Sequence, residues 1–499
     1  MTRGADRTSG FAARCGLDDA SRRRSVEDVL RRIDAAGIER VRFAWCDLHG
    51  LTRGKTLMAS AVAHALQEGV GLVGTLMLKD TSDRTAFKVF EPGGMGELAG
   101  FAGAANLVLL ADPESFVELP WAPGTGWMRG QLWHQDGSPV ELDSRRILQR
   151  ALAKLQSAGF GMRCGLEVEF HIYRIRDSAP QLDPELAAWP GLPPQLQLIH
   201  PGYCLLGESW WDMADEPLRI VQQTAQALGL PLSSLEIELG PSQVEAVFEP
   251  MDALAAADSM VLFRAAMKQA LQRAGYFASF VCRPPFPNIM SSGWHLHQSL
   301  VHRDGGGNAF LRAQSAPGTT PLDAGYSLSD VGEHHLAGLL AHARGMAVLC
   351  TPTVNGFARF QPNALAPQSV LWGRDNRGAA LRVVGNCGDG GTRIENRIGE
   401  PAANPYLYMA AQIHAGLDGI AGELRAAPAT DAPYAEQAAR LPGGLEEALA
   451  ALAADRVLCA GLGQTFVDYF VRIKRAELAR YQAAEDKLDF QRREYFSRF

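Results

Sequence analysis

The chain of 499 residues has little of several features that mark specialised classes of protein. Its eight cysteines are spread singly, with no C-x-x-C pair and no zinc-finger spacing, which excludes a disulfide scaffold and favours reduced thiols in the cytoplasm. There are 48 Lys and Arg against 55 Asp and Glu, so the basic surplus that general nucleic-acid binding needs is missing. The N-terminus has no apolar segment after its arginines, so we expect no secretory signal.

Long hydrophobic runs are also missing. The most apolar stretch, 336–350, is interrupted by His342 and Arg344, so we expect no transmembrane helix and no membrane partner. What is present is an ordinary globular mixture of 47% hydrophobic and 21% charged residues. A chain of this length and composition buries a large core and is too long for one small domain.

The expected helices and strands place two domains after a short tail, and the fold class that they indicate is α+β. We expect residues 1–24 to be a flexible N-terminal tail and residues 25–140 to be a small domain that begins with a helix over 26–36 and a strand over 41–46. Residues 141–499 form the second domain. In it we expect helices over 144–158, 216–229, 251–274, 332–350, 404–423 and 445–482, and strands over 162–173, 235–248 and 293–301.

Two carboxylates lie within an apolar strand, GLEVEFHIY. Glu167 and Glu169 are two residues apart, so they face the same side of the strand. Two like charges at this spacing repel each other unless a cation lies above them. On an exposed strand they would simply be solvated, but the flanking Leu166 and Phe170 argue for a buried one. The segment therefore favours metal binding.

Two further segments repeat this theme. The Gly-Pro-Ser break between Glu238 and Glu245 turns the chain, so that both carboxylates can converge on one point. His295 and His297 also share one strand face. A single buried histidine is more often a core residue, and two at this spacing leave the functional and structural interpretations equally open.

The last segment, Arg393-Ile-Glu395-Asn-Arg397, alternates charge along one strand face and would by itself be more typical of a surface ladder. Taken together, the segments supply carboxylates and imidazoles but no thiolate, which suits Mg²⁺ or Mn²⁺ better than structural zinc. Arginines accompany them at Arg359, Arg374, Arg377, Arg382, Arg393 and Arg397. Divalent cations with convergent arginines indicate a phosphorylated ligand, and neither a P-loop nor a dinucleotide motif is present.

Five ordered motifs resemble the glutamine synthetase family, bacterial type I branch, from about residue 25 to the C-terminus. They are GLEVEF, E-x-G-P-S-Q-x-E, SSGWHLHQSL, WGRDNRG and TRIENRIGEPAANPYL. The resemblance implies a β-grasp domain over 25–140 and a catalytic domain over 141–499, which is built on a curved antiparallel sheet with surrounding helices. It also implies a homododecamer whose active sites lie between subunits.

The resemblance further implies an ATP-dependent ligase with two or more Mg²⁺ or Mn²⁺ ions in each site. The γ-carboxylate of glutamate attacks ATP, and a nitrogen nucleophile then attacks the γ-glutamyl phosphate. One metal site would be held by Glu169, Glu238 and Glu245, and the other by Glu167, His295 and Glu395.

The resemblance assigns the remaining site residues to ATP and to the substrates. ATP would be bound by His297, Ser299, Arg377, Arg382 and Arg393. Arg359 and Arg397 would bind glutamate, and Asp47 would reach into the neighbouring subunit's site to bind the amine. Within this set we take Asp47, Arg359 and Arg377 as the catalytic residues.

The sequence departs from the family at the flap Pro362-Asn-Ala-Leu365-Ala-Pro367, where ammonia-using members carry a glutamate at the position of Leu365. An apolar residue there disfavours ammonium and favours an apolar amine, best an arylamine such as aniline, as in the γ-glutamylamine ligases of amine catabolism. Met290 and Ser291 replace an Asn-Gly pair that contacts the amino acid in the family. Tyr434 lacks the context of an adenylylated tyrosine, so we expect no such control.

Several alternatives remain open. The protein could be an ordinary glutamine synthetase whose flap aligns differently, a ligase for alkylamines or polyamines, a mutase of hydroxylamino-aromatics, or a non-catalytic relative. The complete set of metal-binding residues argues against the non-catalytic relative.

Overall fold

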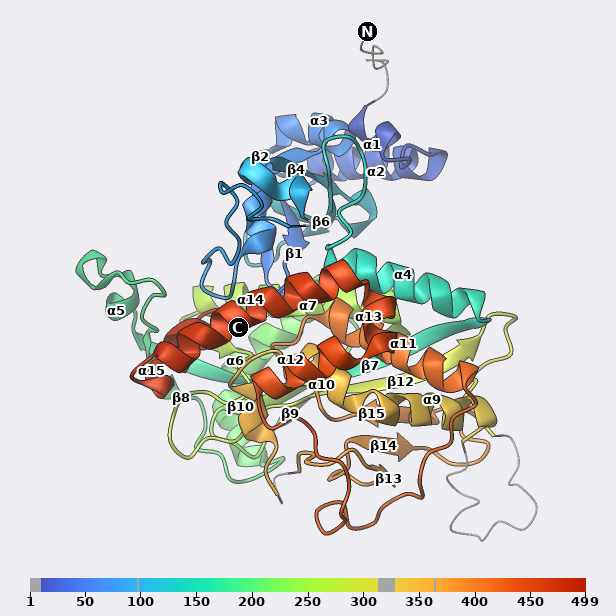
Figure 1. The fold of residues 1–499 in the computed structure, drawn as a ribbon. Helices are drawn as coiled ribbons and strands as arrows, with labels where there is room; N and C mark the ends of the chain where they lie inside the picture. The colour runs from blue at the N-terminus through green and yellow to red at the C-terminus, as the bar shows by residue number, and fades with distance from the viewer. Residues whose placement is uncertain (1–9, 97, 313–327, 363–364) are drawn as a thin grey trace. The chain divides into compact units, whose positions relative to one another are not determined.

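The computed structural model describes residues 10–96, 98–312, 328–362 and 365–499 (Figure 1). The chain divides into two compact units. Unit 1 comprises Met1–Arg146 with residues 227–229, and unit 2 comprises Ile147–Gln226 and Leu230–Phe499. The domain boundary expected after residue 140 lies near the division that follows Arg146. In the part of the chain that the structure describes, no helix is long and apolar enough to cross a membrane.

Unit 1 is built on a six-stranded sheet with the strand order β2-β1-β6-β4-β3, in which β5 also pairs with β6. Its neighbours are antiparallel except for β1 and β6, which run parallel. The strands are β1 (Arg40–Cys46), β2 (Thr52–Met58), β3 (Val70–Val73), β4 (Asn106–Ala111), β5 (Val117–Glu118) and β6 (Thr125–Trp133). The helices are α1 (Phe11–Arg14), α2 (Ala20–Ala35), α3 (Ala59–Glu68) and the 3₁₀ turns η1 (Gly74–Leu78), η2 (Ala99–Ala104) and η3 (Pro113–Ser115).

The helix expected over 26–36 begins earlier, at Ala20, because the Asp19 side chain caps it by accepting from the Arg22 amide. Part of the expected tail is therefore helical. Phe11 in α1 packs into a buried cluster with Leu110 and Trp133. Residues 1–9 of that tail lie outside the described residues.

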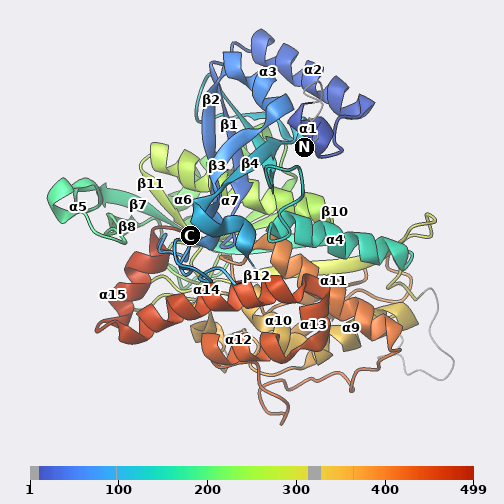
Figure 2. The same cartoon turned by 45° about the horizontal axis from the view of Figure 1, so that its top comes forward.

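Unit 2 contains a nine-stranded sheet in the order β13-β14-β15-β12-β7-β10-β9, with β8 and β11 also pairing with β7 (Figure 1). Figure 2 labels β7, β8, β10, β11 and β12 of this sheet. Its long central strand is β7 (Phe160–Asp177). The others are β8 (Gln195–Leu198), β9 (Leu232–Ile237), β10 (Gln243–Asp252), β11 (Tyr276–Ser279), β12 (Trp294–His302), β13 (Trp372–Arg374), β14 (Leu381–Val384) and β15 (Arg393–Asn396). The strand expected over 235–248 is two strands, because Ser242 takes a left-handed backbone with φ of 60° and reverses the chain.

Most helices of unit 2 lie near the expected positions, but several are broken. The helix expected over 216–229 begins eight residues earlier, at Glu208, so Pro217, a residue typical of a first turn, lies inside it. The long helix expected over 445–482 is three helices, because the Asp455 side chain caps a new start and Gly463 has a φ of 99°. His342, with φ of −103° and ψ of 5°, separates α9 from α10 without a side-chain cap. The helices are α4 (Ser144–Ser157), α5 (Ala179–Leu182), α6 (Glu208–Ala227), α7 (Ala253–Arg273), α9 (Asp330–Ala341), α10 (Ala343–Cys350), α11 (Pro405–Ala421), α12 (Leu445–Ala454), α13 (Arg456–Leu462), α14 (Gln464–Ala483) and α15 (Lys487–Gln491), with the short turns η4 (Pro184–Leu186), η5 (Gly356–Arg359) and η6 (Arg492–Phe496).

The sheet of unit 2 has one face buried beneath helix α7, which packs against β7, β10 and β11. The Phe170 ring on β7 stacks on Phe280 and meets Phe263 of α7 edge to face. Side chains alternate along a strand, so Phe170 pointing toward the helix places its neighbours Glu167 and Glu169 on the opposite face. That polar face carries the candidate site.

Candidate active site

Strand register brings the acidic segments together. Glu167 on β7 lies opposite His295 on β12, and His297 lies opposite Glu395 on β15. On the other side of β7, Glu169 lies opposite Glu245 on β10. Directly paired residues share one face of a sheet, so side chains from four strands converge over the centre of β7.

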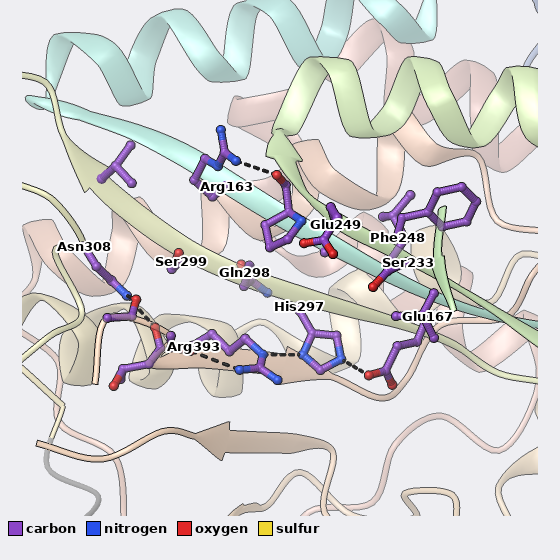
Figure 3. A pocket seen from close by; sticks show the side chains of 18 of the residues that line it. Arg163, Glu167, Ser233, Phe248, Glu249, His297, Gln298, Ser299, Asn308 and Arg393 are labelled. Carbon is purple, nitrogen blue, oxygen red and sulfur yellow. Dashed lines mark hydrogen bonds and ion pairs between the residues drawn. The ribbon is translucent and has the colours of Figure 1, made fainter. Parts of the chain in front are cut away.

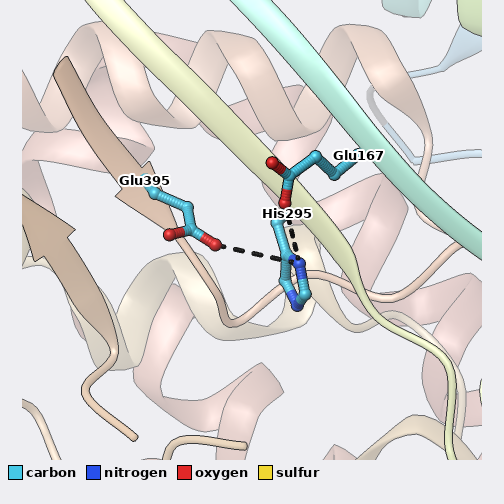
Figure 4. Close-up of side chains that lie close together, drawn as sticks. All are labelled: Glu167, His295 and Glu395. Carbon is cyan, nitrogen blue, oxygen red and sulfur yellow. Dashed lines mark ion pairs between the residues drawn. The ribbon is translucent and has the colours of Figure 1, made fainter. Parts of the chain in front are cut away.

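The first cluster consists of Glu167, His295 and Glu395 (Figure 4). The His295 Nδ1 lies 3.5 Å from a Glu167 oxygen and 3.8 Å from a Glu395 oxygen. One ligand atom from each residue lies within 4.8 Å of the others. This is the set that the family resemblance implied for one metal ion, and two carboxylates with one imidazole form a suitable ligand set for Mg²⁺ or Mn²⁺.

The second cluster joins Glu169 and Glu245 to the other ring nitrogen of His295. Glu169 Oε1 lies 3.7 Å from His295 Nε2. The other oxygen of Glu169 accepts from the Gly293 amide at 2.9 Å and from the Gln243 side chain at 3.0 Å. Its orientation is thus fixed by hydrogen bonds.

Glu238, the third residue expected in the second metal site, lies just after β9 and outside this compact cluster. Burial and the negative charge of Glu169 raise the pKa of Glu238 to about 7. Burial, together with Glu169 and Glu167, raises the pKa of Glu245 to about 10. The repulsion between these neighbouring carboxylates favours their protonation. A bound divalent cation would relieve that repulsion.

The first cluster is electrostatically different. Burial opposes ionisation of Glu395, yet Arg397 and His295 outweigh it and lower the pKa of that carboxyl to about 2. Burial likewise opposes the effect of His295 and His297 on Glu167, and the histidines still hold its pKa far below the usual range. Both carboxylates are therefore ionised and ready to bind a cation at neutral pH.

Arginines surround Glu395. Arg382 donates to one Glu395 oxygen at 2.9 Å and also binds Asp375, while Arg397 binds the other Glu395 oxygen. Arg359, on η5, donates to the Arg397 carbonyl at 2.8 Å and lies 3.1 Å from His295 Nε2. Three arginines expected to bind ATP or glutamate thus lie around the first cluster.

A cavity of about 550 Å³ opens beside Glu167 (Figure 3). Its lining includes His297, Ser299 and Arg393, which the resemblance assigned to ATP. Figure 3 shows Glu167, His297 and Arg393 in a row, with 3.0 Å from Glu167 to His297 Nε2 and a 2.9 Å hydrogen bond from Arg393 to His297 Nδ1. The cavity is therefore large enough for a nucleotide and reaches the first cluster.

Two expected residues are members of neither cluster. Arg377 is exposed in the loop between β13 and β14. Asp47 belongs to unit 1, where its carboxylate accepts from the amides of His49 and Leu51 and from Arg53 at 2.6 Å.

In the flap, Asn363 and Ala364 lie outside the described residues. Leu365 is 58% exposed, and its carbonyl accepts from Arg397 at 3.3 Å. Ser291, at the other departure from the family, accepts a hydrogen bond on its hydroxyl oxygen from Arg283 at 3.2 Å.

Sequence reasoning assigned no role to several residues of the site. The Gln243 side chain donates to both Glu169 and the Ser292 hydroxyl. Gln243 belongs to the E-x-G-P-S-Q-x-E motif, in which the sequence predicts a role only for the glutamates. Asp375 pairs with Arg382 from within WGRDNRG. The cavity-lining residues Arg163 and Asn308 carry no pattern in the sequence that separates them from ordinary surface residues.

Comparison with known proteins agrees with this geometry. The family model of the glutamine synthetase catalytic domain matches residues 141–493. The chain is 38% identical over 483 residues to a γ-glutamylanilide synthase from Acinetobacter, covering 95% of this chain and 94% of that protein. It is 30% identical to the γ-glutamylethanolamide synthetase GlnA4 of Streptomyces coelicolor, covering 92% and 93%.

Solved structures show the same similarity. A GmaS complex with ADP matches with a TM-score of 0.74 and 27% identity, covering 93% of this chain and 98% of that one. GmaS without ligand matches with the same TM-score and 28% identity. The chain belongs to the glutamine synthetase family and is a ligase.

Proposed function

We propose that the protein joins the γ-carboxyl of glutamate to an apolar amine at the expense of ATP, with an arylamine such as aniline as the preferred class. The observation that carries this proposal is Leu365, an exposed apolar side chain next to Arg397 in a flap where ammonia-using relatives carry a carboxylate. The similarity to a γ-glutamylanilide synthase supports the same amine class.

The chemistry of Leu365 disfavours ammonium. A leucine neither neutralises an ammonium ion nor accepts its proton, and burying the unpaired cation would cost several kcal/mol, on the order of a hundredfold or more in affinity. An arylamine is neutral near pH 7, so it needs no base before it attacks. An apolar flap therefore suits this nucleophile.

The two clusters are suited to Mg²⁺ or Mn²⁺. We assign Glu167, His295 and Glu395 to one ion, and Glu169, Glu245 and Glu238 to another, because crowded carboxylates with one imidazole match the oxygen-rich sets that these ions prefer. Bound cations would offset the negative charge of the ATP phosphates.

The chain's own residues orient the substrates. We assign the cavity-lining residues His297, Ser299 and Arg393 to the nucleotide. Arg377 and Arg382 would contact its phosphates. Arg359 and Arg397 hold glutamate. Asp47, from a neighbouring copy of the chain in a cytoplasmic homododecamer, completes the amine site.

A second candidate function is ligation of glutamate to a small polar amine, favoured by the similarity to a γ-glutamylethanolamide synthetase.

One experiment separates the candidates. ATP consumption is measured with glutamate and Mg²⁺ or Mn²⁺ against ammonium, isopropylamine, ethanolamine, putrescine and aniline, and the products are identified by mass. We expect a γ-glutamyl adduct with aniline and little glutamine. Preferred formation of glutamine or of the ethanolamide would contradict the arylamine assignment, and turnover without ATP would indicate a mutase.

A further inference from the structure

One tyrosine contacts two segments of the proposed site. Tyr434 lies in the segment between α11 and α12, and its hydroxyl donates to the Ala366 carbonyl at 3.2 Å. Its ring lies against Gly378, where a Cβ would come within 3.1 Å of the ring carbon Cε2. Ala366 follows Leu365 in the flap, and Gly378 follows Arg377. A single side chain therefore touches both the amine flap and the loop assigned to the ATP phosphates.

The flap residue that Tyr434 helps to hold has an unfavourable backbone. Leu365 has a φ of 50°, in the left-handed region that residues with a side chain rarely adopt. Its carbonyl accepts from Arg397, and the next carbonyl accepts from Tyr434. Such a conformation persists only where the surrounding contacts hold it, and here two side chains hold consecutive carbonyls.

The other side of Tyr434 is firmly attached. Thr430 donates its amide to the Trp372 carbonyl at 2.9 Å, and the Asn376 side chain donates to the Thr430 carbonyl at 3.3 Å. The segment that carries Tyr434 is thus hydrogen-bonded to the loop that carries Arg377. A side chain at Gly378 would press on Tyr434 and on Pro433, which a Cβ would approach to 2.8 Å.

Burial raises the pKa of the Tyr434 phenol, with the charge of Arg397 acting in the opposite direction. The hydroxyl therefore keeps its proton at neutral pH and remains a donor to the flap.

We infer that Tyr434 is a positioning residue that ties the Leu365 flap to the Arg377 loop and thereby sets the dimensions of the amine pocket. This inference rests on the proposed function, because it takes Leu365 as a wall of that pocket. Within the described residues, the hydroxyl and ring of Tyr434 contact Ala366 and Gly378 and not the two metal-binding clusters, so its effect is transmitted through the backbone of residues 365 and 366.

The test compares two substitutions of Tyr434 by steady-state kinetics with the amine that the wild-type enzyme prefers. Tyr434→Phe keeps the ring against Gly378 and removes the hydrogen bond to the flap. We expect the KM for the amine to rise about fivefold and the KM for ATP to stay within about twofold, since one neutral hydrogen bond is lost on the flap side alone. ATP hydrolysis in the absence of amine should also increase, because a looser flap admits water.

Tyr434→Ala removes the ring as well, so the KM for ATP should rise along with that for the amine. Tyr406→Phe is the matched control, because it removes a tyrosine hydrogen bond of 2.7 Å, to Asp258, that does not involve the flap. It should change thermal stability without changing the KM for the amine relative to the KM for ATP.

An unchanged amine KM in Tyr434→Phe, or an equal change in both KM values that Tyr406→Phe reproduces, would overturn the inference. Because the amine is chosen from wild-type turnover, failure of the arylamine assignment appears in the wild-type panel and failure of the Tyr434 role appears in the variants.

Discussion

Glu167 on β7 and His295 on β12 are directly paired across the antiparallel register, with 3.5 Å between a carboxylate oxygen and the ring Nδ1. The same nitrogen lies 3.8 Å from Glu395, which a third strand supplies. Backbone hydrogen bonds between the strands fix these positions, so the side chains of the first cluster are arranged by the sheet itself.

Glu167→Gln should abolish most metal-dependent activity. The amide is nearly the same size as the carboxylate but carries no charge, so one of the two ionised oxygen ligands of the first cluster is lost. We expect Mn²⁺ affinity to fall by about a hundredfold or more, with a similar loss of ATP turnover. A Mn²⁺ titration followed by electron paramagnetic resonance measures the affinity directly.

Glu333→Gln is the control for this substitution. Glu333 lies on α9 in a partly exposed ion pair with Arg425, and the same chemical change there should leave Mn²⁺ binding and turnover unaltered. Wild-type Mn²⁺ affinity in Glu167→Gln would show that the first cluster is not a metal site.

Removing divalent cations should destabilise the protein, and more so at higher pH. The folded-state pKa values of Glu238 and Glu245, about 7 and about 10, lie above their ordinary value of 4.5. At these two positions the metal-free folded chain therefore binds more protons than the unfolded chain above pH 4.5, so their contribution to stability falls as pH rises from there toward these folded-state values. A cation replaces those protons and reverses the loss.

Thermal unfolding with EDTA and with excess Mg²⁺ measures this effect. At a hundredfold excess over Kd, Mg²⁺ should contribute about 2.7 kcal/mol, and the rise in Tm should be larger at about pH 8 than at about pH 6. A rise in Tm that is independent of pH would mean that these carboxylates do not exchange protons for the metal.

That each closely spaced pair of site residues shares one strand face could be predicted because the spacing is local. The two-residue spacing of Glu167 and Glu169, and that of His295 and His297, determines which side of a strand they face, whatever the strand pairs with. That the strands meet in one sheet does not follow from spacing, and it entered through the family resemblance.

Contacts that depend on long-range register could not be predicted. The pairing of Arg382 with Asp375 and Glu395 requires β14 to lie beside β15 with a particular offset.

The helix breaks could not be predicted for a different reason. The apolar periodicity of 445–482 continues through Asp455 and Gly463, so the pattern hides a cap and a left-handed residue that end the helices.

His342 should stabilise the fold at mildly acidic pH. Its ring lies 2.8 Å from Asp455 and 3.0 Å from Asp418, and although burial opposes charging, these carboxylates raise its pKa. A raised folded-state pKa contributes stability that is complete below the unfolded value of about 6.5 and is lost as pH rises through the folded value.

The His342→Gln variant should therefore differ most from wild type in Tm at about pH 5 to 6, and the difference should shrink in alkaline solution. Thermal melts of both proteins across this range, with Mg²⁺ held constant, measure the effect. A difference that grows with pH would contradict a charged His342 between the two aspartates.

Leu365→Glu should move the amine preference toward ammonium. The new carboxylate can pair with the ammonium ion and take its proton, so kcat/KM for ammonium should rise by at least about tenfold, which corresponds to 1.4 kcal/mol. The same charge removes apolar surface from the flap, so kcat/KM for aniline should fall by a similar factor.

Leu365→Met is the control, because it keeps an apolar side chain of similar volume and should preserve the preference for aniline over ammonium. If Leu365→Glu and Leu365→Met have the same ratio of aniline to ammonium turnover, the flap residue does not select the amine. If instead that ratio reverses in Leu365→Glu alone while the KM for ATP stays constant, the charge at this one position decides which nitrogen attacks the γ-glutamyl phosphate.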